Sequence, residues 1–220
     1  MKHIEVLSEV IRNRKTEKVL GNPAQPVRYS ATQLNEGDEI VKRSIKESGW
    51  APFHYNRRQD GLAEPWRVWW MNQAECLALC QKLPRLIPDL KPGNKMPALL
   101  AGCGSLTLYT WLPEGQGNQT DPSKVERINR EHLAATASAV QNFLLLLTAH
   151  GIANYWASGT LIQNHLFPEL GIPVDQVLAA AVFAHYPNPS GPVEVIAGKQ
   201  REHRSSDAHW LRDIRTLGAE

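Results

Sequence analysis

The run LAATASAVQNFLLLLTA, residues 133–149, decides how this chain is organised. Its apolar and small side chains lie on nearly every side of a helix, so that helix needs packing partners on several faces. Ser123-Lys124-Val125-Glu126 has the spacing of a capping box that begins the helix, and Gly151 is placed to end it. We therefore expect one long buried helix over 123–150. Part of it packs against a second subunit, or else one subunit buries it completely.

The segments around this helix predict both helices and strands. Apolar residues at helical spacing predict further helices over 3–12, 32–48 and 72–83. Aromatic, β-branched and continuous apolar runs predict strands over 65–71, 96–110 and 177–185. Residues 19–31, with one glycine and two prolines, predict a loop. The order of elements predicts a single α/β (α+β) domain over residues 1–220, with a central β-sheet flanked by helices.

Composition narrows the class of protein. The 220 residues carry a formal net charge of only +2, which argues against a nucleic-acid-binding protein. Cys76, Cys80 and Cys103 are odd in number and are expected to stay reduced, as in cytoplasmic proteins. The first residues lack the apolar segment of a signal peptide, and the longest apolar run, 143–147, is too short to span a bilayer. We expect a soluble, cytoplasmic protein with no membrane partner.

The chain lacks the usual motifs of protein-based catalysis. It has no dinucleotide-binding or phosphate-loop glycine pattern, no nucleophile elbow, and no histidine or cysteine spacing typical of a metal site. Gly102-Cys103-Gly104 is interpreted as a packing feature within a strand, and His132 is expected on the exposed start of the long helix. Binding groups without a nucleophile or a metal are typical of an enzyme whose organic cofactor supplies the reactive atom.

Those binding groups include the run from Arg12 to Lys18, which holds four cations and one threonine in seven residues. Guanidinium and ammonium groups make charge-assisted hydrogen bonds to phosphate, each worth about 1.5–3 kcal/mol. Taken alone, the run also suits a solvated basic helix end, where cations complement the helix dipole. Residues 12–18 by themselves leave both interpretations open.

Four short segments, in this order, resemble the FMN-dependent nitroreductase family. They are RKTEK at 14–18, APFH at 51–54 followed by EPW at 64–66, ANYWASG at 153–159 and KQR at 199–201. The resemblance extends over most of the chain. It implies a mixed central sheet between helices and an intertwined homodimer, with two FMN sites at the interface.

The resemblance also implies the site residues, with no catalytic side chain and no metal. It implies that FMN phosphate and ribityl groups meet Arg14, Lys15, Thr16 and Lys18, with the phosphate clamp completed by Lys199 and Arg201. It implies that the flavin ring is lined by Trp156, Ala157 and Ser158 and touched at its rim by Trp50 and His54, from the same or opposite subunits. The implied reaction is ping-pong: NAD(P)H reduces the flavin, and a nitroaromatic, quinone or similar conjugated acceptor reoxidises it.

Several residues depart from the family pattern. Phe53 replaces a small or acidic residue, eight residues (56–63) separate the two halves of the second segment, and Glu64 stands where glutamine is common. His185 lies in the last core strand, where glycine is common. These departures bear on the substrate, and they keep two alternatives open. One is a flavin-binding carrier or sensor without turnover; the other is a reductive dehalogenase or flavin-fragmenting enzyme of the same fold.

Overall fold

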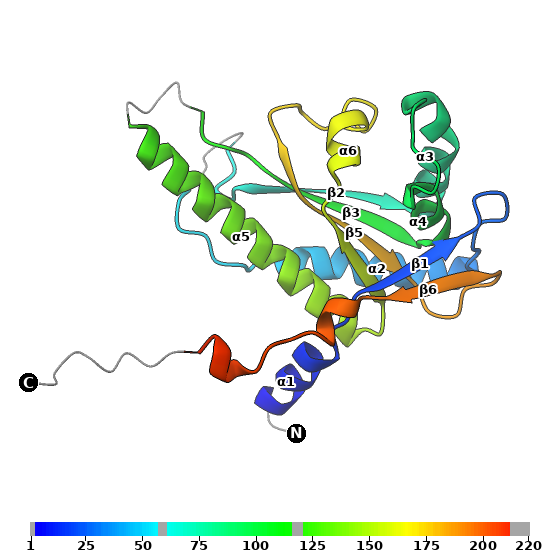
Figure 1. Cartoon of the computed structure of the whole chain (residues 1–220), viewed down its shortest axis with the longest axis horizontal. Helices are drawn as coiled ribbons and strands as arrows, with labels where there is room; N and C mark the ends of the chain where they lie inside the picture. Colours follow the sequence, from blue (N-terminus) through cyan, green and yellow to red (C-terminus); the bar gives the residue numbers. More distant parts are fainter. Residues whose placement is uncertain (1–2, 57–60, 116–120, 212–220) are drawn as a thin grey trace, which may run out of the picture.

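The computed structural model describes residues 3–56, 61–115 and 121–211 (Figure 1). The helices are α1 (His3–Asn13), α2 (Ala31–Ser48), α3 (Gln73–Leu86), α4 (Met96–Gly102), α5 (Pro122–Ala149) and α6 (Thr160–His165). The strands are β1 (Glu17–Gly21), β2 (Trp66–Asn72), β3 (Ser105–Trp111), β4 (Ala153–Ala157), β5 (Val177–His185) and β6 (Val193–Ala197). Two 3-10 turns follow, η2 (Lys199–Arg201) and η3 (Asp207–His209).

The central sheet has four strands in the order β2-β3-β5-β4, and β1 pairs with β6 in a separate two-stranded sheet. The α+β class and the helix-flanked sheet are confirmed. The predicted mixed sheet is wrong within the described ranges, because every pair of strands there is antiparallel. Strands β3 and β4, which α5 connects, do run in the same direction, but β5 lies between them and pairs with both.

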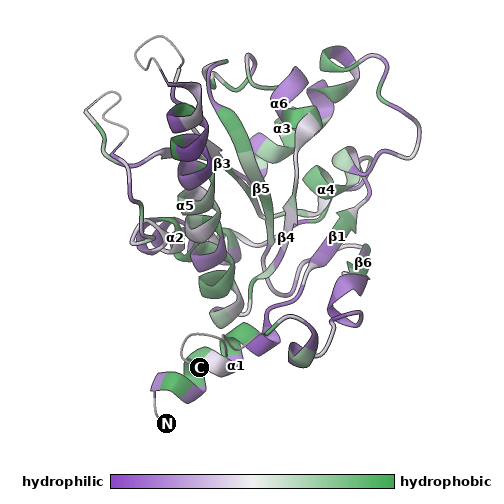
Figure 2. Ribbon diagram, turned by 60° about the vertical axis from the view of Figure 1, so that its left-hand side comes forward, coloured by the Kyte–Doolittle hydropathy of each residue, from purple (hydrophilic) through white to green (hydrophobic). Residues whose placement is uncertain are grey.

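Helices cover the sheet on both sides, giving three layers (Figure 2). One face packs against α2 and α5, and the other packs against α3, α4 and α6. Side chains of β5 alternate between the two faces: Val182 belongs to the α5-side core and Phe183 to the α3-side core, and both are fully buried. A strand that is buried on both faces is expected to be continuously apolar, which explains the uninterrupted run of β5.

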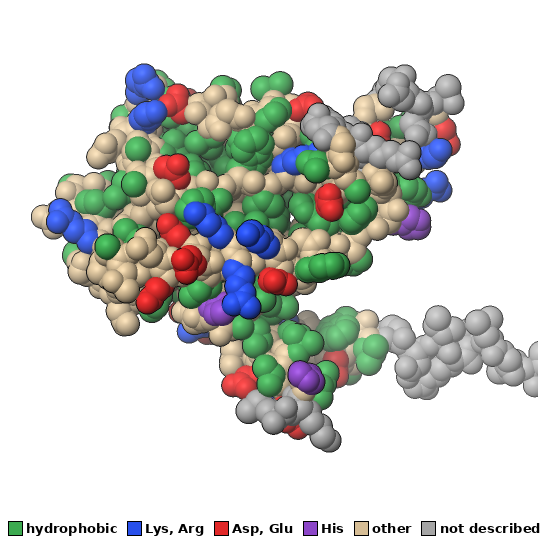
Figure 3. Space-filling model, turned by 180° about the vertical axis from the view of Figure 1, so that it is seen from behind, with side chains coloured by type: hydrophobic (Ala, Val, Ile, Leu, Met, Phe, Trp, Pro, Cys, Tyr) green, Lys and Arg blue, Asp and Glu red, His purple; other side chains and the backbone are tan. Residues whose placement is uncertain are grey.

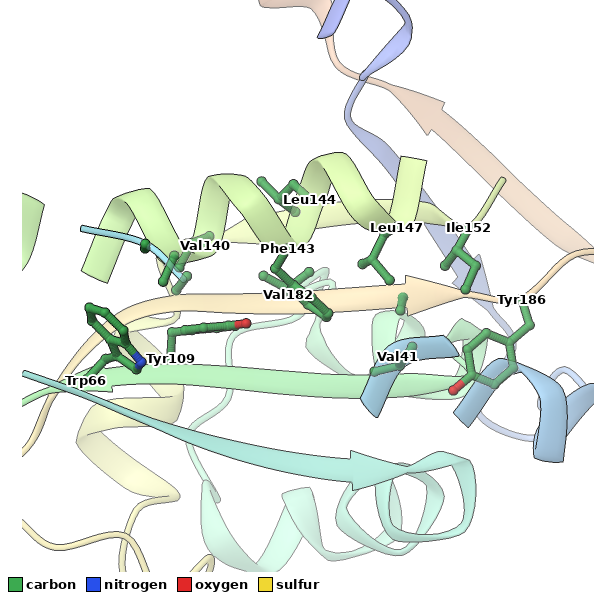
Figure 4. Close-up of a cluster of buried hydrophobic side chains, with 14 of the residues drawn as sticks. Val41, Trp66, Tyr109, Val140, Phe143, Leu144, Leu147, Ile152, Val182 and Tyr186 are labelled. Atoms are coloured by element: carbon green, nitrogen blue, oxygen red, sulfur yellow. The ribbon is translucent and has the colours of Figure 1, made fainter. Parts of the chain in front are cut away.

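The long helix α5 forms the centre of the α5-side core (Figure 4). Phe143 and Leu147 point toward β5, and both of them, like Leu144, are fully buried. By length and composition α5 could cross a membrane, and among the described residues it is the one helix that passes this test. Its buried face packs on β5 and α2, so here it is the core helix of a folded domain.

The start of α5 differs from the prediction in two ways. The N-cap is Asp121, whose carboxylate accepts from the backbone N–H of Ser123, so the predicted capping box at 123–126 is wrong. The helix therefore begins at Pro122, a residue suited to the first helical position. His132 is buried rather than exposed, and its imidazole Nε2 lies 3.8 Å from Glu114 Oε1.

The predicted strand over 96–110 is wrong in its first half. Residues 96–102 form α4, and only Ser105–Trp111 form a strand. A short apolar run does not distinguish a buried strand from a buried helix, and the proline in the first turn of α4 was the available signal for a helix. Gly102 does serve packing, because a Cβ there would lie 2.5 Å from the carbonyl oxygen of Val19.

The predicted loop over 19–31 is also wrong at its start, since β1 extends to Gly21. Its partner, β6, is about 175 residues further along the chain, so no local pattern reveals the pairing. The helices predicted over 3–12, 32–48 and 72–83 are confirmed to within a few residues, as are the strands over 65–71 and 177–185.

Candidate functional site

The pairing of β1 with β6 brings the two basic segments of the chain together. Glu17 lies opposite Ala197, and the N–H of Gly198 donates to the carbonyl of Thr16 at 2.8 Å. A Cβ at Gly198 would lie 2.8 Å from the Thr16 Cβ, so the absence of a side chain permits this approach. The turn η2 follows at once and places 199–201 beside the basic run near the N-terminus.

The side chain of Arg201 binds the backbone of the basic run near the N-terminus. Its guanidinium donates to the carbonyl of Arg14 at 2.8 Å and also to the carbonyl of Arg12. These contacts use two of the five guanidinium donors. Arg201 therefore fixes the backbone that carries Arg14, and Lys199 beside it is exposed.

Arg14 is half-buried and is the central cation of this cluster. Its Nη1 lies 3.5 Å from the acceptor Thr16 Oγ1, and its buried Nε has no acceptor among the residues that the structure describes. Burial, followed by the charge of Arg204, lowers the pKa of the Arg14 guanidinium below its ordinary value. Figure 3 shows Lys and Arg side chains gathered on the middle of one face, above the junction with α1. Such a cluster favours a bound anion.

Two lysines complete this part of the site in different ways. Lys15 forms an exposed ion pair with Glu17, with 3.1 Å between Nζ and Oε1. Lys18 instead extends over the ring of Tyr155, with its Nζ 4.7 Å from the ring centroid. Tyr155 belongs to β4, so Lys18 connects the basic cluster to that strand.

Strand β4 and the turn after it hold the residues implied for the flavin ring, and β1 lies beside β4 (Figure 2). Trp156 packs in the α5-side core and donates from Nε1 to the Ala179 carbonyl at 3.3 Å. Ala157 points to the opposite side, and Ser158 is exposed in the turn. Gly159 adopts a left-handed conformation with φ = 68°, and a side chain there would collide with a buried leucine. Only glycine suits this turn.

Trp50 and His54 lie away from β4 within one chain. The side chain of Trp50 is 85% exposed and borders a groove of about 500 Å³ between α1 and the C-terminal half of α5. His54 stacks on Tyr55 and lies 3.4 Å from the carboxylate of Glu131 on the N-terminal half of α5. Within one chain, the strand β1 that follows the predicted phosphate residues lies beside β4, whereas Trp156 faces the α5-side core and these two rim residues lie apart.

The donor set fits a phosphate monoester joined to a planar ring. Its cations and one hydroxyl converge at the start of β1, and β1 lies beside β4, the strand that a tight glycine turn follows. Within the described ranges, no group of three or more His, Cys, Asp or Glu side chains is placed to hold a metal. A separate groove of about 370 Å³, beside β2 and α3, is lined by none of these residues.

Sequence reasoning did not identify Tyr155 as a site residue. It lay inside the recognised segment 153–159, but nothing local indicates that Lys18 reaches its ring. The alternation of side chains along a strand was the available signal, since it places Tyr155 and Ala157 on the same side of β4.

Comparisons with known proteins support the fold. No family model and no curated protein matches the chain. Solved structures do match, and many of them are nitroreductases or nitroreductase-like proteins. A nitroreductase-like family protein from Bacillus cereus has a TM-score of 0.64 at 18% identity, covering 94% of this chain and 95% of that one.

Two further structures extend this result. A nitroreductase-type protein from Desulfovibrio desulfuricans, in complex with FMN, has a TM-score of 0.58 at 18% identity. The match covers 96% of this chain and 98% of that one. The nitroreductase CinD from Lactococcus lactis, in complex with chloramphenicol, has a TM-score of 0.63 at 15% identity. The match covers 97% of this chain and 100% of that one. The chain has the nitroreductase fold over nearly its whole length, and the predicted resemblance is confirmed at that level.

Proposed function

We propose that this protein is an FMN-dependent oxidoreductase that takes electrons from NAD(P)H and passes them to a nitroaromatic, quinone or similar conjugated acceptor. The observation that carries the proposal is the convergence of two distant basic segments at the start of β1, a strand that lies beside β4. The fold supports it, because structure neighbours from several bacteria were solved with FMN. The reaction is ping-pong, with both half-reactions at one site.

The basic cluster holds the phosphate. Arg14 and Thr16 supply donors, Lys15 and Lys199 add charge at the rim, and Arg201 keeps the backbone of the cluster in place. These cations attract a dianionic phosphate, and the pKa of Arg14 is lowered first by its burial and then by the nearby charge of Arg204. Binding is therefore expected to weaken as salt concentration rises.

The ring lies against the end of β4 and the turn that follows. FMN supplies the chemistry when bound, since its ring accepts two electrons from the reductant and releases them to the acceptor. Ala157 and Ser158 leave room for a flat ring because they are small, and Gly159 fixes the direction of the backbone N–H groups in the turn. Lys18 holds a positive charge beside β4, where negative charge develops on reduction.

A homodimer is part of this proposal. None of the described side chains of α1 is buried, and the groove between α1 and α5 exposes Leu7, Trp50 and Leu146. Exposed apolar patches of this kind are typical of interfaces. In the dimer, Trp50 or His54 from one subunit reaches the flavin bound by the other, which accounts for their distance from β4 within one chain.

The first test is an absorbance spectrum of the purified protein, before and after incubation with FMN. We expect bands of bound flavin, bleaching by NADH or NADPH under anaerobic conditions, and recovery when a quinone or nitroaromatic is added. Protein that takes up no FMN would refute the proposal. Bound FMN with no turnover across acceptors would favour the carrier or sensor. Dehalogenated products or fragments of the flavin would favour the remaining alternative.

Replacing both Arg14 and Lys18 with alanine tests the phosphate and ring assignments directly. We expect a loss of about 3–6 kcal/mol of binding free energy, a hundredfold or more in the FMN dissociation constant, because two charge-assisted contacts are removed. The matched control replaces Arg43 and Lys46, two exposed cations on α2, and keeps the same net charge as the double variant. Fluorescence titration with FMN measures both. Equal affinities in the two double variants would contradict the assignment.

A further inference from the structure

Lys18, Tyr155 and Phe183 form a column that connects the core to the candidate site. The rings of Tyr155 and Phe183 are stacked, with centroids 6.1 Å apart and planes 19° from parallel. Phe183 is fully buried in β5, so the lower ring is immobilised by the α3-side core. The Lys18 ammonium lies over the upper ring at 4.7 Å, within the range of a cation–π contact.

The backbone of Lys18 is fixed as well. The residue lies in β1 opposite Ile196 of β6, and its neighbour Leu20 packs against the α3-side core. Side chains alternate along a strand, so Lys18 and Leu20 point the same way, toward the Tyr155 side of β4. Strand pairing and the aromatic ring thus restrain both ends of the lysine.

Lys18 differs from Lys15 in its partner. Lys15 is neutralised by Glu17, whereas Lys18 forms no ion pair with a carboxylate in the described part of the chain. An aromatic face attracts an ammonium through its quadrupole but carries no net charge. Tyr155 therefore holds the ammonium in place and leaves its full charge available to an anion.

We propose that Tyr155 is a positioning residue that holds the Lys18 ammonium beside the flavin ring, so that it stabilises the negative charge of the reduced cofactor. This inference rests on the proposed function. Reduced flavin carries negative charge at its pyrimidine edge, and a preplaced cation stabilises that charge without reorganisation. The consequence is a higher reduction potential of the bound FMN.

The test compares Tyr155→Leu with Tyr155→Phe in the FMN-loaded protein. Phenylalanine keeps the ring and the stack on Phe183, whereas leucine keeps apolar packing and removes the quadrupole. We expect Tyr155→Leu to weaken binding of reduced relative to oxidised FMN by about tenfold, which is about 30 mV in the two-electron midpoint potential. Tyr155→Phe should leave the potential close to that of the native protein. Spectroelectrochemical titration measures these potentials.

A double-mutant cycle with Lys18→Met separates positioning from a general effect of the ring. If Tyr155 acts through Lys18, Tyr155→Leu lowers the potential in the native background and has no further effect in Lys18→Met. An equal shift in both backgrounds, or no shift in either, would overturn the inference. Tyr155→Met, with a flexible side chain that fills the space beside Phe183, takes the place of the leucine variant should that variant fail to fold.

Failure of the inference is distinguishable from failure of the proposed function. A native protein that takes up no FMN refutes the function before any variant is needed. A native protein that binds and reduces FMN, together with a Tyr155→Leu variant of unchanged potential, refutes only the role of Tyr155. Inorganic phosphate as a competitor gives an independent readout, because Tyr155→Leu should leave its inhibition constant unchanged.

Discussion

Helices α1 and α5 both carry an apolar face, yet the chain covers only one of them. On α5, Phe143 and Leu147 are fully buried against the sheet, whereas on α1 Ile4, Leu7 and Ile11 remain 65%, 50% and 53% exposed. Figure 1 shows α5 lying along the sheet and α1 projecting from the body. An apolar helix face thus has two outcomes in this chain: on α5 it stabilises the subunit, and on α1 it stays exposed, where we propose that it serves assembly.

The largest effect on stability is expected from a substitution on the buried face of α5. Phe143→Ala should lower the free energy of unfolding by about 3–5 kcal/mol, because it leaves a cavity between α5 and β5. Leu7→Ala on α1 should lower it by less than about 1 kcal/mol at concentrations where the protein is monomeric. Urea unfolding followed by circular dichroism measures both. Similar losses for the two variants would show that α1 belongs to the core.

The α3-side core contains a histidine that makes stability depend on pH. Burial lowers the pKa of His185 to about 4, although its Nδ1 lies 2.9 Å from the Gly102 carbonyl. The unfolded chain binds this proton first as pH falls, because its histidine pKa is near 6.5. Stability should therefore be constant above about pH 6.5 and fall by on the order of 3 kcal/mol toward pH 4.

Unfolding free energies measured between pH 4 and pH 7 test this dependence. His185→Gln should flatten the profile over that interval, even if it lowers stability at pH 7. His54→Gln is the matched control, because the His54 side chain is largely exposed on the outer side of α5. A profile as steep in His185→Gln as in the native protein would assign the acid sensitivity to other groups.

The smallest effect is expected on dimer formation, from a substitution on the exposed apolar face of α1. Leu7→Asp places a charge in the middle of the exposed face of α1, and we expect the dimer dissociation constant to rise at least tenfold, about 1.4 kcal/mol. Glu9→Lys alters charge on the opposite face of α1 and should leave assembly unchanged. Sedimentation velocity over a range of concentrations measures this. A native protein that stays monomeric throughout would refute the role given to α1.

The sequence predicted those elements whose pattern is local. The helices α1, α2, α3 and α5 and the strands β2 and β5 have periodic or continuous apolar runs, and their positions are confirmed. The helix α4 was missed because its seven residues suit a strand equally well. The β1–β6 pair was missed because each strand is five residues long and its partner is distant in the sequence.

In the candidate site, too, local patterns could be predicted from the sequence and contacts between distant segments could not. Arg14, Thr16 and Lys18 were predicted from one short segment, and the structure places them together at β1. What sequence alone did not predict is how each side chain is used. Arg201 donates to backbone carbonyls, and Lys18 lies over an aromatic ring. Both contacts depend on strands that meet only after folding.

The insertion of β5 between β3 and β4 has a consequence for synthesis of the protein. While the chain is being made, β3, α5 and β4 leave the ribosome before the strand that must join them. Until residue 185 has emerged, the apolar face of α5 and the edges of β3 and β4 lack their native partner. Folding is therefore expected to be slow, since it depends on non-local pairing. During that interval the exposed apolar surface and the unpaired strand edges make the chain prone to aggregation.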